Sequence, residues 1–331
     1  MEHLGMYDLK GMSTDRLVEL ITDKRVSVLE AFGKKRLYRT LLPIRWLVKF
    51  ALWIIFRKAK TSADARKRAV ELLDKFTPYQ VHGISLKTSQ TNQPPTIIGF
   101  NHPSLGEIAR LISLCFRIFP ERPLIFPVTL PWFEMFAPFK HRFDGLGMTI
   151  TPIITPHATE TLLKSFPSVS TDNNHDSTAL SPKALNSSDA RETLTSLRLK
   201  LQGRYLQLCE KTLKDHGIVL LAPSAQRQET IFPDIKTFIR EKPLPPVMTM
   251  IVRKMLSSGI DDLLIVPICV IPPENHTKMI NLFKVYGLVC SQCFKTADFR
   301  MTTAEDFEYR FYRAISDCPG AEKIKYPKQP L

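Results

Sequence analysis

A histidine and a carboxylate five residues apart, His102 and Glu107, are the best candidates for chemistry in this sequence. A histidine can take a proton from a hydroxyl group near neutral pH, and a carboxylate on its other ring nitrogen fixes the tautomer that accepts the proton. Such a pair acts without a protein nucleophile. Capping of a helix by Glu107 is an alternative explanation, so the surroundings of the pair must decide between the two.

The segments around this pair predict a buried strand that leads into a helix. Residues 96–100 (TIIGF) form the strand, and an apolar helix follows over residues 107–119. Ligands of α/β sheets gather outside the carboxyl ends of the strands, and helix N-termini offer free N–H groups to a developing oxyanion. The turn between the two elements therefore places His102 and Glu107 where a substrate is expected to bind.

Short apolar runs alternate with helical stretches from residue 81 onward. The predicted strands cover residues 81–86, 96–100, 124–127, 148–154, 218–222, 263–271 and 283–289, and the predicted helices cover residues 107–119, 159–164, 190–216, 247–256 and 304–315. This alternation predicts an α/β domain with a layered, largely parallel sheet flanked by helices. We expect the domain to span residues 81–331, with a flexible insertion, rich in Ser, Asn, Asp and Thr, at residues 166–188.

The first 80 residues are expected to form a helical, basic, amphipathic region that associates with a membrane. Residues 41–56 (LLPIRWLVKFALWIIF) are apolar and hold two tryptophans, but Arg45 and Lys49 interrupt them. A spanning helix needs about 20 apolar residues with few charges, so this stretch suits an interfacial helix better. Flanking Lys and Arg residues favour an anionic membrane surface, and packing of the apolar face on the core is the alternative.

The net charge of +14 indicates an anionic partner, because 46 Lys and Arg outnumber 32 Asp and Glu. The cations gather beside the tryptophan-bearing helix, and no nucleic-acid-binding motif is recognised, so we expect a membrane surface and no nucleic acid. Six cysteines without a signal peptide predict free thiols in a reducing compartment. Cys290 and Cys293 lack a second pair and a histidine at ligand spacing, so we interpret them as partly buried thiols at a strand end and expect no metal.

The segment Asn101-His102-x-Ser104-x-x-Glu107 resembles the N-H-x-S-x-x-D signature of the glycerolipid acyltransferases, the family that contains the 1-acylglycerol-3-phosphate acyltransferases. The resemblance covers residues 81–289 by the order and spacing of segments. It implies that His102 and Glu107 are catalytic. Glutamate in place of aspartate moves the carboxylate by about 1.5 Å, which a small shift of the helix can absorb. No G-x-S-x-G elbow surrounds Ser104, which favours a turn-stabilising or capping hydroxyl over a nucleophile.

Two further blocks resemble the parts of the family that hold the acceptor. Residues 127–152 resemble the second block, whose strand usually ends in an arginine, but Thr151 and Pro152 stand there in this chain. The nearby Lys140, His141 and Arg142 can supply the positive charge instead, and a solvated basic loop is the alternative.

The third block differs more from the family pattern. Residues 220–228 (LLAPSAQRQ) fall where the family has a strand followed by F-P-E-G-T-R-S. Pro223 and Arg227 match this pattern, while Ser224 and Ala225 replace its glutamate and glycine. Arg227 is expected to bind phosphate, since a guanidinium group matches the geometry of a phosphate.

The resemblance implies an O-acyltransferase of phospholipid biosynthesis. It would transfer a fatty-acyl group from acyl-CoA or acyl carrier protein, as co-substrate, to the hydroxyl of a lysophospholipid, without another cofactor. We expect a peripheral or monotopic protein on the cytoplasmic face of a membrane. The altered third block leaves two alternatives open: acylation of a different lipid or glycolipid, or a catalytically inactive lipid-binding protein. The residues expected to bind substrate are Arg227, Ser104, Lys140, Arg142 and Pro223.

Overall fold

The structure is a computed structural model, and it describes residues 11–23, 35–83, 94–101, 107–154, 159, 187–222, 247–273, 283–290, 292–299 and 303–320. The chain forms two compact units. The smaller unit comprises residues 1–49, 127–141 and 150–205, and the larger unit comprises residues 50–126, 142–149 and 206–331. The expected division of the chain at residue 80 stays a prediction.

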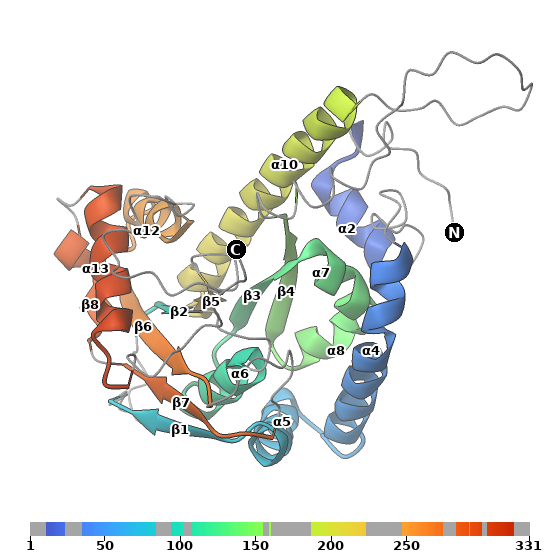
Figure 1. The fold of residues 1–331 in the computed structure, drawn as a ribbon, viewed down its shortest axis with the longest axis horizontal. Coiled ribbons are helices and arrows are strands. Elements are labelled where there is room, and N and C mark those ends of the chain that lie inside the picture. Colours follow the sequence, from blue (N-terminus) through green and yellow to red (C-terminus); the bar gives the residue numbers. More distant parts are fainter. Residues whose placement is uncertain are drawn as a thin grey trace, which may run out of the picture. The chain divides into compact units, whose positions relative to one another are not determined.

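An eight-stranded, largely parallel sheet forms the centre of the fold (Figure 1), which confirms the predicted α/β class. The strand order is β1-β7-β6-β2-β5-β3-β4, and β8 pairs with β6. Strand β2 is parallel to both of its neighbours, whereas β6 is antiparallel to β7 and β8. The strands are β1 (Tyr79–His82), β2 (Thr96–Phe100), β3 (Leu124–Thr129), β4 (Met148–Ile153), β5 (Ile218–Leu221), β6 (Leu264–Ile271), β7 (Tyr286–Val289) and β8 (Phe294–Lys295).

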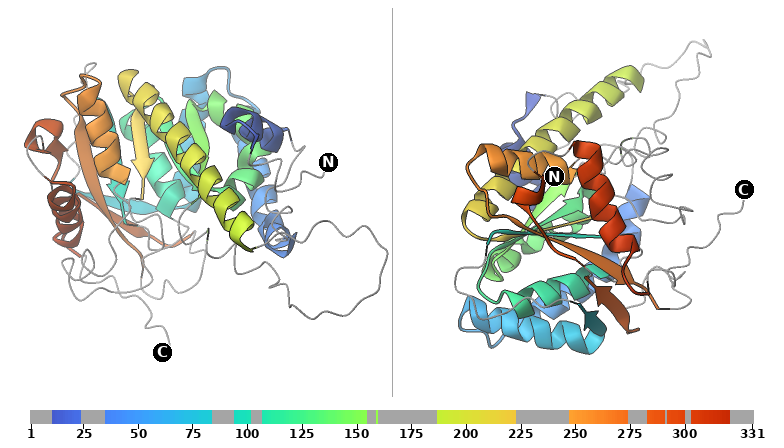
Figure 2. Two further views of the ribbon diagram at one scale, coloured as in Figure 1. Left: turned by 90° about the horizontal axis from the view of Figure 1, so that it is seen from above. Right: turned by 90° about the vertical axis from the view of Figure 1, so that its left-hand side faces the viewer.

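Helices cover both faces of the sheet in the larger unit. Helices α5 and α6 lie on one face, and α12 and α13 lie on the other (Figure 2). The described α-helices are α2 (Thr14–Thr22), α4 (Lys35–Phe56), α5 (Ser62–Phe76), α6 (Glu107–Ile118), α7 (Leu130–Phe136), α8 (Lys140–Gly145), α10 (Ser187–Lys214), α12 (Val247–Ser257) and α13 (Ala304–Ser316). Two short 3-10 helices are η1 (Ala137–Phe139) and η2 (Thr296–Phe299).

Gly99 allows α12 and α13 to pack directly against strand β2. A Cβ atom at this position would lie 2.5 Å from the ring of Phe311 on α13 and 3.1 Å from the sulfur of Met248 on α12. Successive side chains of a strand point to opposite faces, so Ile98 and Phe100 point toward the face that α6 covers. Gly99, the one residue of β2 without a side chain, thus lies on the face of the strand that Phe311 of α13 and Met248 of α12 cover.

Strands β1 and β7 differ most from the predicted ranges. Strand β1 begins at Tyr79, two residues early, and ends at His82. Its end has a local cause: Gly83 has a left-handed φ of 73°, and a Cβ atom there would lie 2.2 Å from the carbonyl oxygen of Cys290. Strand β7 starts three residues later than predicted, and the apolar Phe283 and Val285 before it are exposed. The predicted helix at 159–164 and insertion at 166–188 lie outside the described residues, apart from residues 159, 187 and 188.

In the smaller unit, the beginning of α2 is held by the first part of α10. Arg204 on α10 pairs with Asp15 at 2.7 Å, and Lys200 donates a hydrogen bond to the carbonyl oxygen of Met12 at 3.2 Å. The hydroxyl of Ser13 caps α2 by accepting from the N–H of Arg16. The apolar face of α2 is buried at Leu17, Val18, Leu20 and Ile21.

Helix α4 contains the tryptophan-bearing stretch and extends it toward the N-terminus. Its exposed apolar side chains are Trp46, Leu47, Phe50 and Trp53, and Lys49 lies 4.9 Å from the centre of the Trp46 ring. Helical spacing places these four residues on one side of α4. In the part of the chain described above, no helix combines the length and the apolar character that crossing a bilayer requires.

Candidate active site

The carboxyl end of β2 is the centre of the candidate site. All five residues of β2 are buried, and the strand lies between the parallel strands β5 and β6. The register pairs Thr96 with Ile218 on β5 and with Leu264 on β6. Three parallel strands therefore end at the same edge of the sheet, which is where α/β proteins bind their ligands.

Asn101 holds the chain immediately after β2. Its side chain is 2% exposed, its Nδ2 donates to the carbonyl oxygen of Val270 at 3.0 Å, and its Oδ1 accepts from the N–H of Val270 at 2.6 Å. An amide side chain can serve in this way as both donor and acceptor for one backbone residue. The residue that precedes His102 is thus tied to strand β6.

Glu107 holds the other end of the segment. It is the first residue of α6, and it is fully buried. A buried carboxylate is costly unless it is hydrogen-bonded or paired with a charge, and the first turn of a helix favours a negative charge. The position of Glu107 therefore agrees with both the predicted orienting role and the simpler capping role.

Arg110, one turn after Glu107, is a buried residue that the sequence interpretation missed. It donates to the carbonyl oxygens of Pro78 (3.0 Å) and Lys284 (2.7 Å), and its guanidinium lies 3.8 Å from the centre of the Tyr286 ring. Burial lowers the pKa of Arg110 to about 10, and the charges of Tyr286 and Glu107 oppose this shift. An arginine three residues after an acid on an otherwise apolar helix is the sequence signal that points to it.

The structure describes only some of the predicted site residues. His102, Ser104, Pro223 and Arg227 lie outside the described residues, whereas Asn101 and Glu107, which bracket His102, are described. The dyad of His102 and Glu107 therefore stays a prediction, supported by the fixed positions of the residues at both ends of its segment.

Lys140 and Arg142, the other predicted acceptor-binding residues, both lie on α8. Each is half-buried, with part of its surface open to solvent. Thr151, which stands near the place of the family's arginine, is fully buried on β4. Its hydroxyl has no hydrogen-bond partner among the described residues. Phosphate binding by Lys140 and Arg142 stays a prediction.

A second buried acid, Glu308 on α13, lies on the face of the sheet that α12 and α13 cover. Its Oε1 accepts from the N–H and the hydroxyl of Thr249 on α12, at 3.3 and 3.0 Å. Burial raises the pKa of Glu308 to about 7, and the two hydrogen bonds from Thr249 oppose this shift. The described residues include no group of three or more His, Cys, Asp and Glu side chains arranged to bind a metal ion.

The chain was compared with family models, curated proteins and solved structures, and matches were found among the solved structures. No family model matches the sequence, and no curated protein matches it. Among solved structures, the chain is similar to the crystal structure of PlsC, the 1-acyl-sn-glycerophosphate (LPA) acyltransferase from Thermotoga maritima. The two chains share 11% sequence identity with a TM-score of 0.39, and the match covers 94% of this chain and 99% of the other.

Proposed function

We propose that this chain is an O-acyltransferase that transfers a fatty-acyl group from acyl-CoA or acyl carrier protein to the hydroxyl of a lysophospholipid. One observation carries the proposal: Asn101 and Glu107, the first and last residues of the motif around His102, are both buried, Asn101 bonded to Val270 at the carboxyl end of β2 and Glu107 at the start of α6. This is the place where a proton-transfer pair meets the substrates of an α/β protein.

In this mechanism His102 takes the proton of the acceptor hydroxyl, and Glu107 holds the imidazole in the required tautomer. The hydroxyl oxygen attacks the thioester carbonyl, and the tetrahedral intermediate then expels the thiolate, which receives the proton from His102. The N–H groups at the start of α6 favour the negative charge that develops on the carbonyl oxygen. Arg227, with Lys140 and Arg142, provides the positive charge that attracts the acceptor phosphate.

The test compares purified wild-type protein with His102→Ala, using an acyl-CoA donor and lysophosphatidic acid in mixed vesicles. We expect the variant to lose at least about 100-fold in kcat, the usual contribution of a general base. His82→Ala is the matched control, because His82 is an exposed histidine on β1. Equal turnover by wild type and His102→Ala would refute the mechanism. A phosphate-free acceptor that reacts faster than lysophosphatidic acid would keep the mechanism and change the acceptor.

We propose that α4 attaches the enzyme to the membrane that holds its acceptor. Its exposed aromatic residues are accompanied by cations, since Lys49 lies over Trp46 and Arg57 lies over Trp53 at 5.1 Å. Aromatic rings with adjacent Lys and Arg suit the headgroup region of an anionic bilayer.

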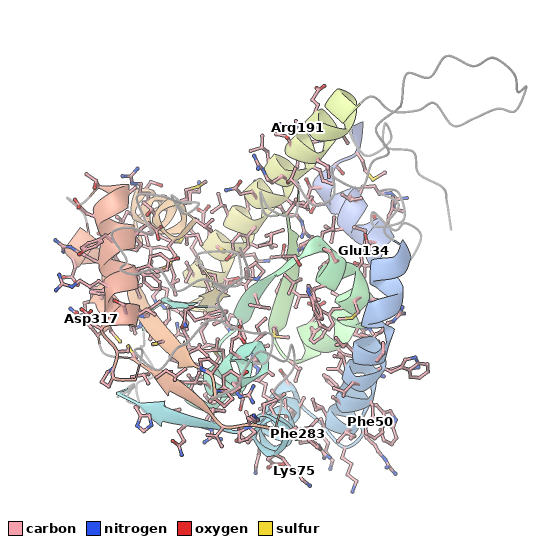
Figure 3. All side chains as sticks on the ribbon, viewed as in Figure 1. Phe50, Lys75, Glu134, Arg191, Phe283 and Asp317 are labelled. Carbon is pink, nitrogen blue, oxygen red and sulfur yellow. The ribbon has the colours of Figure 1, made fainter. Side chains whose placement is uncertain are left out.

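A second exposed apolar area of the larger unit supports the attachment. Phe283 is 72% exposed, and its ring packs edge-on against that of Phe76, with centroids 6.0 Å apart. Figure 3 shows Phe50, Lys75 and Phe283 along the lower edge of the drawing. Exposed aromatic residues and an exposed lysine thus come from three separate segments of this unit, and residues of these types suit contact with anionic lipid.

A further inference from the structure

Cys290 and Cys293 form a thiol pair at the end of β7. Cys290 follows the last residue of β7, and Cys293 precedes the first residue of β8. The two Sγ atoms are 3.7 Å apart and share a hydrogen bond. The pair is asymmetric in its surroundings, because Cys290 is buried and Cys293 is exposed. The interpretation as two thiols at a strand end describes their place but leaves their chemistry open.

The hydrogen bond divides the roles of the two sulfurs. The hydrogen bond with Cys293 and burial raise the pKa of Cys290, and the same hydrogen bond lowers the pKa of Cys293 against the effect of desolvation. Burial thus favours the protonated form of Cys290, while the exposed Cys293 has the greater thiolate character. A thiolate that is accessible to solvent is the form that attacks disulfides.

Besides Cys293, Cys318 is the only described cysteine whose charge raises the pKa of Cys290. The thiol of Cys318, however, is hydrogen-bonded to other groups. Its Sγ donates to the carbonyl oxygens of Ala314 and Val289, at 3.2 and 3.5 Å, and it is buried. A surface hollow of about 1160 Å³ adjoins the pair, and its lining includes Cys290, His82 and Gly83. The lining of this hollow includes Cys290 but not Cys293, so an external disulfide reaches Cys293 through its own exposed surface.

We propose that Cys290 and Cys293 are a thiol–disulfide exchange site, which a small-molecule disulfide converts reversibly into an intrachain disulfide bond. Cys293 attacks one sulfur of the external disulfide, so that a mixed disulfide forms and one thiolate leaves. Cys290 then attacks the Sγ of Cys293, and the second thiolate leaves. The two protein thiols are oxidised, the external disulfide is reduced to two thiols, and the two cysteine protons pass to the leaving groups.

The geometry needs only a small change for this reaction. A disulfide bond is about 2.05 Å long, so the two sulfurs must approach each other by about 1.7 Å. The product would join the end of β7 to the start of β8, and it would make residues 290–293 a closed ring.

The experiment exposes the folded, reduced protein to oxidised glutathione, blocks remaining thiols with N-ethylmaleimide, and maps the cysteines by mass spectrometry. We expect a Cys290–Cys293 disulfide that dithiothreitol reverses. In Cys290→Ser, a glutathione adduct should remain on Cys293, because the resolving thiol is missing. In Cys293→Ser, we expect at least about tenfold less adduct on Cys290, the buried thiol.

Cys318→Ser is the matched control, and it should still form the disulfide. Blocking of both Cys290 and Cys293 by N-ethylmaleimide in wild-type protein after the exposure would overturn the proposal, and so would a bond between Cys290 and Cys318. The masses of the peptides report the result without any measurement of acyl transfer. A failure of the acyltransferase proposal therefore leaves this test intact.

Discussion

Glu107 is the residue at which the catalytic and structural interpretations can be separated. Its carboxylate is buried, and its charge acts on the pKa of Arg110. We expect Glu107→Gln to lower kcat by at least about 100-fold, because a neutral amide cannot stabilise the imidazolium of His102. Glu107→Asp should keep most of the activity, since the family signature has aspartate at this position. Steady-state kinetics of the two variants provide the measurement.

As a control for this prediction, the free energy of unfolding of the same variants is measured. If Glu107 only balances the charge of Arg110, Glu107→Gln should lower the free energy of unfolding and leave kcat of the folded enzyme unchanged. A loss of kcat in a variant with an unaltered denaturant midpoint would assign the orienting role.

Glu308 makes the stability of the protein depend on pH. Its pKa is raised from 4.5 to about 7 in the folded state, so the folded chain binds the proton more tightly than the unfolded chain. This group therefore adds stability at low pH, and the contribution is lost as the pH rises from 4.5 to about 7. We expect Glu308→Gln to be more stable than wild type at pH 8, by up to about 3 kcal/mol, and equally stable near pH 4.

Urea unfolding at several pH values measures this difference. Glu71→Gln is the control, because Glu71 is an exposed acid on α5 and its replacement should leave the pH profile unchanged. A Glu308→Gln profile parallel to that of wild type between pH 4 and 8 would contradict the prediction.

At the scale of the elements, Gly99 couples strand β2 to helices α12 and α13. Gly99→Ala would place a methyl group 2.5 Å from the ring of Phe311, so the ring or its helix must shift. We expect a loss of about 1–3 kcal/mol in the free energy of unfolding, as for other overpacked cores. Gly203→Ala is the matched control: no atom lies within 4 Å of the added Cβ in helix α10, and the change should stabilise the protein by about 0.5–1 kcal/mol. Equal stability of the two variants would contradict this account of the packing.

Most of the sheet could be predicted from the sequence, because buried parallel strands appear as short apolar runs. Residues 96–100 match β2 at both ends, and residues 148–154 match β4 within one residue. Strand β1 was misplaced because its side chains are largely exposed, and its end depends on the contact between Gly83 and Cys290, which is distant in sequence. Helix α5 lies within the region that was expected to be helical, but its bounds were not predicted, because its buried residues are small or charged, such as Ala65, Arg66 and Ala69.

The candidate site could be predicted less completely. The motif identified Asn101 and Glu107 by residue type and spacing, but the bonds from Asn101 to Val270 join residues 169 apart in the sequence. The packing of Arg110 on Tyr286 depends on tertiary structure in the same way. Residue types indicate which groups can react, whereas only the folded chain shows which groups hold them in place.

At the scale of the whole molecule, the proposed membrane attachment depends on α4. Replacement of Trp46, Phe50 and Trp53 by serine removes three exposed aromatic side chains without changing the charge. We expect at least about tenfold weaker binding to vesicles that contain anionic lipid, because each ring contributes apolar area at the interface. Co-sedimentation with vesicles measures the effect.

The matched control is Leu199→Ser, which removes an apolar side chain of 59% exposure from α10. It should leave vesicle binding unchanged, and higher salt should weaken the binding of wild type. Undiminished binding of the serine variant of α4 would assign attachment to another surface.

The bonds of Asn101 have a consequence for solubility. Strand β6 continues past Ile268, the residue paired with the end of β2. Val270 is paired with Leu288 of β7 on one side, and among the described residues no strand lies on its other side. An open strand edge attracts other chains, and the side chain of Asn101 occupies both hydrogen-bonding groups of Val270 there. We therefore expect replacement of Asn101, a residue first identified by its place in the proposed catalytic motif, to expose this edge and to reduce the yield of soluble protein.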